Sequence, residues 1–236
     1  GNILIMFDSQ YLKIIKGKGD DFVYEYNHPL LKLFISIDSL VKGPALGGCR
    51  YLTTTNRSEA LLEVKKLAKV MTYKNIVMDL PFGGGKSIIY FAKESRDETF
   101  LHFGSLLNFL KGIYLTADDM NVSINDMETM RKITPYAHGI FNKNGEQIPA
   151  TPYGISLAIK TTIELFESKN HSGKKTIFIS GLGKVGMNLC KFLPKNDFKI
   201  FGYDPDIKKS LDAKLKYGVE IVSPHCIFEE KIDIFS

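Results

Sequence analysis

The sequence predicts an α/β fold in two domains, the second of them built on a parallel sheet. Apolar runs typical of strands alternate with amphipathic helical segments along most of the 236 residues. Residues 138–150 are rich in Gly, Asn, Lys and Pro and break this pattern, so we place a domain boundary there, with domains over residues 1–149 and 150–236. Beyond it, strand and helix alternate regularly, as in β-α-β units.

The first domain is expected to mix strands with amphipathic helices. Helices are predicted over residues 58–72, 95–111 and from 123 onward, and strands over 22–26, 31–37, 88–91 and 113–116. Asn56 or Ser58 can cap the first helix. Ser95 with Glu98, and Ser123 with Asp126, form capping boxes for the other two. The glycine-rich runs at 43–48 and 81–86 are interpreted as a loop and a turn.

The second domain repeats one strand–helix unit. We predict helices over residues 153–168, 184–193 and 207–216, and strands over 176–180, 198–203, 219–222 and 232–235. This order is typical of half of a doubly wound sheet with right-handed crossovers. No covering helix follows the last strand, so the sheet is expected to be cut short at the C-terminal end.

A glycine fingerprint opens the second domain. Gly181, Leu182, Gly183, Lys184, Val185 and Gly186 follow a predicted strand and begin a helix. The first glycine allows a tight turn, the second lets a pyrophosphate approach the backbone, and the third lets helix and strand pack closely. The helix N-terminus adds N–H donors for the phosphates. This context indicates a Rossmann dinucleotide-binding domain, whereas an ordinary glycine turn is the alternative.

An acidic residue indicates which dinucleotide is bound. Asp204 closes the next strand, 18 residues after Gly186. A carboxylate there can accept the ribose hydroxyls of NAD and repels the 2′-phosphate of NADP. Lys208 and Lys209 lie close behind and weaken that repulsion. The sequence therefore predicts NAD as the cofactor.

Composition excludes several other classes. The net charge is +5, without a block of like charges, so nucleic-acid binding is not expected. No apolar run approaches the ~18 residues of a membrane span. The three cysteines are too few and too scattered for a disulfide framework or a metal site, which favours a reducing cytoplasm.

The run of three glycines before Lys86 has two interpretations. A Walker A loop needs a glycine five positions before Gly85, and Leu80 stands there instead. An active-site lysine is the functional alternative, because burial disfavours the charged ammonium and lets a lysine work as a general base. The simpler interpretation is a solvent-exposed lysine after a turn.

Two further groups could complete such a site. Lys74, at the end of a helix, either interacts with the helix dipole or holds a substrate carboxylate. Asp118 and Asp119 follow a strand and either cap a helix or face an amine. The sequence alone leaves these alternatives open.

Six blocks in colinear order carry a resemblance to a known family. They are residues 43–50 (GPALGGCR), 71–74 (MTYK), 83–86 (GGGK), 117–119 (ADD), 151–154 (TPYG) and 181–186 (GLGKVG). Together they resemble the leucine/phenylalanine/valine dehydrogenases, which are related to glutamate dehydrogenase. The resemblance covers nearly the whole chain.

The resemblance implies NAD-dependent oxidative deamination of an L-amino acid to its 2-oxo acid, by a homo-oligomer. It implies that Lys74 binds the substrate carboxylate, that Lys86 is the acid/base group that activates water, and that Asp119 interacts with the amino group. The remaining implied contacts are Leu46, Gly47 and Ala117 with the substrate, and Thr151 with the cofactor. In this picture the substrate domain and the cofactor domain enclose the site.

Leucine is the predicted substrate. Glutamate dehydrogenases carry a lysine where this chain has Leu46, and an apolar residue there would leave a side-chain carboxylate unpaired. Phenylalanine, valine and glutamate dehydrogenases, and a non-catalytic nucleotide-binding relative, remain alternatives. The sequence departs from relatives at His138, where they have Thr, and at Asp118, where they have Glu.

Overall fold

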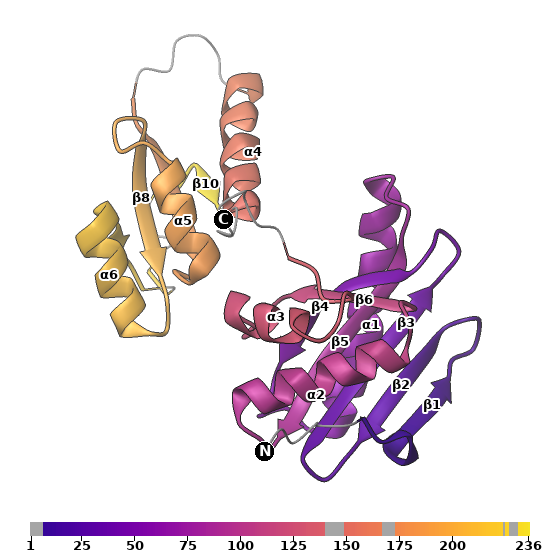
Figure 1. Ribbon diagram of the computed structural model, residues 1–236. Helices are drawn as coiled ribbons and strands as arrows, with labels where there is room; N and C mark the ends of the chain where they lie inside the picture. Colours follow the sequence, from indigo (N-terminus) through magenta and orange to yellow (C-terminus); the bar gives the residue numbers. More distant parts are fainter. Residues whose placement is uncertain (1–6, 140–148, 167–172, 224, 227–230) are drawn as a thin grey trace. The chain divides into compact units, whose positions relative to one another are not determined.

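The chain divides into two compact units, Gly1–Gln147 and Ile148–Ser236, each with its own sheet (Figure 1). The computed structural model describes residues 7–139, 149–166, 173–223, 225–226 and 231–236. The linker predicted at 138–150 lies mostly outside these residues, as does the end of the helix predicted over 153–168. The α/β prediction with a parallel second sheet is confirmed.

In the first unit, a six-stranded sheet has helices on both faces (Figure 1). Its strands are β1 (Leu12–Lys16), β2 (Phe22–Asn27), β3 (Leu31–Ser39), β4 (Ala45–Tyr51), β5 (Gly83–Ala92) and β6 (Tyr114–Asp118), and they lie in the order β1-β2-β3-β5-β4-β6. A 3₁₀ turn, η1 (Ser9–Tyr11), precedes them, and the helices are α1 (Arg57–Val77), α2 (Arg96–Phe109) and α3 (Ile124–Arg131). Strand β4 pairs in parallel with β5 and β6, whereas β1, β2, β3 and β5 are antiparallel neighbours.

Two apolar clusters attach these helices to the sheet. On one face, Phe103 and Leu106 of α2 and Met127 of α3 pack with Tyr114 and other buried strand residues. On the other face, α1 buries Ala60 and Val64 against strand residues that include Ile88. Alternation along β5 therefore turns every second side chain toward α1.

The predicted helix starts are confirmed by side-chain caps. Asn56 accepts a hydrogen bond from the amide of Glu59, and Ser95 with Glu98 forms the predicted capping box. Ser123 with Asp126 forms the second box. Helix α1 continues to Val77 rather than ending near residue 72, so Lys74 lies inside its last turn.

The interpretation of the glycine-rich runs as a loop and a turn is wrong for most of their residues, because 45–48 belong to β4 and 83–86 to β5. Strand β5 begins at Gly83, five residues before the predicted start. A Cβ on Gly84 would lie 2.6 Å from Cα of Thr72 in α1, and one on Gly47 would overlap the carbonyl oxygen of Gly85. These glycines are therefore needed for close approach of backbones rather than for a turn.

The second unit is the predicted parallel sheet. Its elements are α4 (Ala150–Phe166), β7 (Lys175–Ser180), α5 (Lys184–Phe192), β8 (Phe198–Tyr203), α6 (Ile207–Tyr217), β9 (Glu220–Ile221) and β10 (Ile234–Phe235), with strand order β10-β7-β8-β9. All three strand pairs are parallel. Apolar side chains of α4, α5 and α6 form one cluster with Ile177 and Ile200 of the sheet.

Candidate active site

Lys86 and Asp119 meet although they are far apart in sequence. Lys86 lies on β5 and is almost fully buried, and Asp119 directly follows β6. The Lys86 ammonium Nζ is 2.5 Å from the Asp119 carboxylate oxygen Oδ2. A buried ammonium costs free energy unless it is paired, and Asp119 supplies that pairing. The exposed-lysine interpretation is therefore wrong for Lys86.

A chain of alternating charges extends from this pair. The same Oδ2 atom of Asp119 accepts a hydrogen bond from Nε of Arg50 at 2.8 Å, and Nη1 of Arg50 donates to Oε1 of Glu63 at 2.5 Å. The four groups come from β5, the end of β6, β4 and α1. Two cations and two anions cancel in formal charge, which limits the cost of placing them in a partly buried position.

These contacts determine the charge state of Asp119. Burial alone would raise the pKa of this carboxyl group, but the hydrogen bonds from Lys86 and Arg50 outweigh burial and hold the pKa below its usual value. Asp119 is therefore ionised at neutral pH. Burial is the largest effect on the neighbouring Cys49 thiol. It outweighs the lowering effects of Ser87 and the Lys86 charge and raises the pKa of the thiol to about 12, so this thiol is neutral.

The residues predicted to contact the substrate side chain share a face with Lys86. Ala45 and Cys49 belong to the core under α2, so Leu46 between them points to the α1 face. By the same alternation, Ala117 points there because Thr116 contacts buried Tyr114 on the opposite side. Leu46 and Ala117 are both half-buried. Gly47 is a buried backbone position between them in the sheet.

The buried side chain of Tyr114, on β6, supports strand β4 from the face of the sheet that α2 covers. Its hydroxyl donates to the carbonyl oxygen of Gly47 at 2.5 Å, and Oγ atoms of Ser87 and Thr116 lie 3.0 and 3.3 Å away. The Tyr114 hydroxyl therefore links β4 to β5 and β6, and its contact on β5 is Ser87, the residue next to Lys86. No motif in the sequence indicated this role.

Helix α1 brings Lys74 to the start of β5. The buried Asn75 side chain donates to the carbonyl oxygen of Gly83 at 2.7 Å, and Thr72 packs on Gly84. Lys74 lies between these two contacts and is exposed. The last turn of α1 is thus fixed to the strand that carries Lys86, whereas the Lys74 side chain faces solvent.

Arg50 and Glu63 were not singled out by the sequence analysis, although Arg50 lies inside one of the quoted blocks. Interpreting residues 43–48 as a loop hid the signal. Arg50 is in register with Ile88, two residues after Lys86 on the same strand. Had β4 been predicted, alternation would have placed Arg50 on the Lys86 face.

The predicted dinucleotide fingerprint in the second unit has the expected backbone. Gly181 has a positive φ of 95°, and Gly183 caps α5 without a side-chain hydrogen bond. A Cβ on Gly186 would overlap the carbonyl oxygen of Gly181, whereas a Cβ on Gly183 would meet no atom of the described residues within 4 Å. These features fit the three predicted glycine roles. Thr151 is an exposed residue in the first turn of α4.

Asp204 lies at the end of β8, beside the glycine turn. Its Oδ2 atom accepts a hydrogen bond from the Leu182 amide at 2.9 Å, and its Oδ1 atom accepts one from the Asp206 amide at 2.9 Å. The residue is 8% exposed. A carboxylate has about four acceptor positions, so it can still accept from hydroxyl groups.

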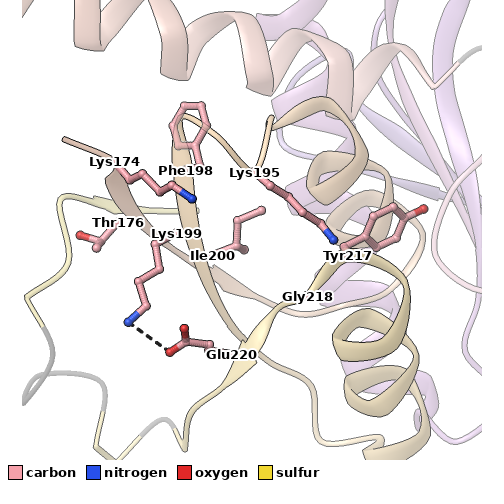
Figure 2. Close-up of a pocket in the computed structure, with 9 residues that line it drawn as sticks. All are labelled: Lys174, Thr176, Lys195, Phe198, Lys199, Ile200, Tyr217, Gly218 and Glu220. Carbon is pink, nitrogen blue, oxygen red and sulfur yellow. Dashed lines mark ion pairs between the residues drawn. The ribbon is translucent and has the colours of Figure 1, made fainter. Parts of the chain in front are cut away.

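A separate hollow lies at the other end of this sheet. Figure 2 shows its lining, which includes Lys174, Lys195, Lys199, Tyr217 and Glu220, and its volume is about 400 Å³. Lys199 forms an ion pair with Glu220 at 3.2 Å. The hollow borders the first residues of β7 and β8, whereas ligands of parallel α/β sheets bind at the carboxyl ends of strands. It is therefore not the predicted dinucleotide site.

Comparisons with known proteins point to one family. The matching family is described as Glu/Leu/Phe/Val dehydrogenase, dimerisation domain, and the match covers residues 27–136. The chain is 35% identical over 211 residues to an L-tryptophan dehydrogenase of Nostoc punctiforme (strain ATCC 29133 / PCC 73102), a match that covers 89% of the chain and 60% of that protein. It is 33% identical to a leucine dehydrogenase of Bacillus subtilis (strain 168), over 87% of the chain and 58% of the relative.

A solved structure agrees with these matches. The crystal structure of L-tryptophan dehydrogenase from Nostoc punctiforme superposes with a TM-score of 0.62 at 29% identity, over 95% of this chain and 62% of that one. The chain thus spans about 60% of the length of its relatives. Among the described residues, no helix is long and apolar enough to cross a membrane.

Proposed function

Because residues 27–136 belong to the dimerisation-domain family of the Glu/Leu/Phe/Val dehydrogenases, we propose that the protein catalyses NAD-dependent oxidative deamination of an apolar L-amino acid. The products are the 2-oxo acid, ammonia and NADH, and leucine is the first candidate substrate. The observation that carries this proposal is the contact between buried Lys86 and ionised Asp119 on one face of the matched domain.

Each residue of the site has a proposed task. The Lys74 ammonium binds the substrate carboxylate, and Asp119 accepts a hydrogen bond from the substrate amino group. The neutral amine form of Lys86 would take the proton from water as the water attacks the iminium carbon. The resulting ammonium, which is the form that pairs with Asp119, would return that proton to nitrogen before ammonia leaves. A nicotinamide cofactor, when bound, would supply the redox chemistry by accepting a hydride from the substrate Cα.

The second unit is proposed as the cofactor domain. Gly181, Gly183 and Gly186, with the amides of Lys184 and Val185, would hold the pyrophosphate at the N-terminus of α5. Asp204 would accept the ribose hydroxyls, which favours NAD over NADP, and Thr151 would lie near the nicotinamide end. We further propose that the protein is a cytoplasmic homo-oligomer, consistent with the description of its family as a dimerisation domain.

Substrate choice remains between leucine and other apolar amino acids. Half-buried Leu46 and Ala117 provide an apolar surface, which disfavours glutamate because its side-chain carboxylate would be left unpaired. The relatives include enzymes named for tryptophan and for phenylalanine as well as for leucine. An aromatic substrate is therefore the second candidate.

A substrate panel on the complete natural protein tests the proposal. We expect NADH formation with L-leucine, and comparison of kcat/KM for leucine, valine, phenylalanine, tryptophan and glutamate ranks the candidates. Lys86→Ala should lower kcat by about 10²- to 10⁴-fold, as loss of a general base does, while the exposed control Lys66→Ala leaves it unchanged. NAD binding without turnover on any amino acid would support a non-catalytic relative instead.

A further inference from the structure

We propose that Arg50 is a positioning residue that holds the Asp119 carboxylate against Lys86. The changes in kcat expected from this inference rest on the proposed function. The expected change in the position of the Asp119 carboxylate does not. Arg50 would touch neither substrate nor cofactor, and would act through Asp119 alone.

The geometry of the shared oxygen supports this role. Asp119 is half-buried and lies just beyond the end of β6, so its backbone is not held in the strand ladder. One of its oxygens, Oδ2, accepts from both Lys86 Nζ and Arg50 Nε, at 2.5 and 2.8 Å. Two donors on one oxygen restrict the rotation of the carboxylate more than one donor can. Within the part of the chain that the structure describes, both contacts fall on Oδ2, which leaves Oδ1 for another donor such as an amine.

Arg50 can do this because it is itself held at two points. Its Nε atom donates to Asp119 and its Nη1 atom donates to Glu63 on α1, at 2.8 and 2.5 Å. Only a planar guanidinium presents donors in such a fixed fork. The side chain is only 20% exposed, so water does not readily replace these bonds. The α1 helix is thereby coupled to Asp119 through Arg50.

A second arginine that contacts another part of the sheet provides a matched control. Arg57, the first residue of α1, forms an ion pair with Glu25 through Nε and Nη2, at 2.6 and 2.8 Å. That pair joins α1 to β2, and neither Lys86 nor Asp119 is among its partners. If Arg50 only stabilises the fold, Arg50→Gln and Arg57→Gln should have similar effects.

The test combines kinetics with a crystal structure of the complete natural protein. For Arg50→Gln we expect kcat to fall about 10- to 100-fold with KM for the amino acid within about threefold, since small misplacement of a reacting group has such effects. Arg50→Lys keeps the charge but reaches only one partner, so its kcat should be intermediate. Arg57→Gln should lose thermal stability and keep its kcat.

The structural part of the test does not require turnover. In Arg50→Gln, and in Arg50→Met should the glutamine variant not fold, the Asp119 carboxylate should rotate beyond hydrogen-bond distance of the Lys86 ammonium or occupy two positions. A carboxylate unchanged in both position and order would overturn the proposal, as would a kcat within twofold of the wild type. If the wild-type protein is inactive on every amino acid, the proposed function fails, and the crystal structure alone decides the role of Arg50.

Discussion

One methyl group added at Gly84 should push helix α1, which carries Lys74, away from strand β5, which carries Lys86. A Cβ there would lie 2.6 Å from Cα of Thr72, whereas ordinary contact begins at 3.4 Å. Strand β5 and helix α1 would therefore have to move apart by about 1 Å, because both clashing parts are backbone. The same movement would break the hydrogen bond from Asn75 to Gly83, which is 2.7 Å long.

The expected cost of Gly84→Ala follows from this overlap. Overpacking of a rigid core usually destabilises by about 1–3 kcal/mol, and a backbone clash belongs to the upper half of that range. For a protein of this size, each kcal/mol lowers the melting temperature by roughly 2–4 °C. We expect a decrease of roughly 4–12 °C by differential scanning calorimetry. A shift of the Lys74 turn relative to Lys86 should also lower kcat by about 100-fold.

The matched control is Gly19→Ala. Gly19 is exposed, and a Cβ there would meet only a carboxylate oxygen of Asp21, at 3.9 Å. Both substitutions restrict the unfolded chain equally, so any difference between them comes from the folded state. Equal melting temperatures for the two variants would refute the argument that Gly84 is required for close packing.

Three further predictions follow from buried groups. Tyr114→Phe leaves the Gly47 carbonyl without its hydroxyl donor, and should lower the free energy of unfolding by about 1–3 kcal/mol in urea titrations. Burial alone would raise the pKa of Asp126, but its contacts with Arg96 and Ser123 together outweigh burial and lower the pKa. The stability that this group contributes is present above its unfolded pKa and is lost as pH falls through the folded pKa, so Asp126→Asn should flatten the decline in stability that urea titrations measure below about pH 4. Iodoacetamide should label the exposed Cys226 in the native protein and spare Cys49 and Cys190. Both of these are buried, and burial raises their pKa values to about 12 and about 11. Peptide mapping that finds all three cysteines labelled equally would contradict this.

Local chemistry made much of the fold predictable. Asn56, Ser95 and Ser123 signal helix starts through contacts within three residues, so no tertiary information is needed. The glycine fingerprint was likewise predictable, since its context is one strand and one helix. Strand β4 and the glycine-rich first half of β5 were not, because a glycine that permits a turn and one that permits close packing look alike in sequence. The distinction depends on a helix that lies many residues away.

The residues of the candidate site also fall into those that the sequence indicated and those that it did not. Lys86, Asp119 and Lys74 stood out because each lies in a quoted block. That Lys86 and Asp119 share an ion pair is a result of sheet order, since β5 and β6 both flank β4. The contact of Arg50 with this pair, and through it that of Glu63, depends on the same strand order. It also depends on the alternation of side chains along β4, most of whose glycine-rich start was interpreted as a loop. Side chains that act only through other side chains leave no periodic signal of their own.

The bonds of Asp204 bear on attempts to re-engineer coenzyme preference. A common strategy would exchange this acid for a small neutral residue so that a phosphorylated ribose is tolerated. Here such an exchange would also release the amides of Leu182 and Asp206, and with them the shape of the turn that we propose holds the pyrophosphate. Asparagine retains one acceptor atom and would preserve one of the two bonds. Under the proposed function, coenzyme preference is therefore better altered at the neighbouring Lys208 and Lys209, because both are exposed and neither accepts from these two amides.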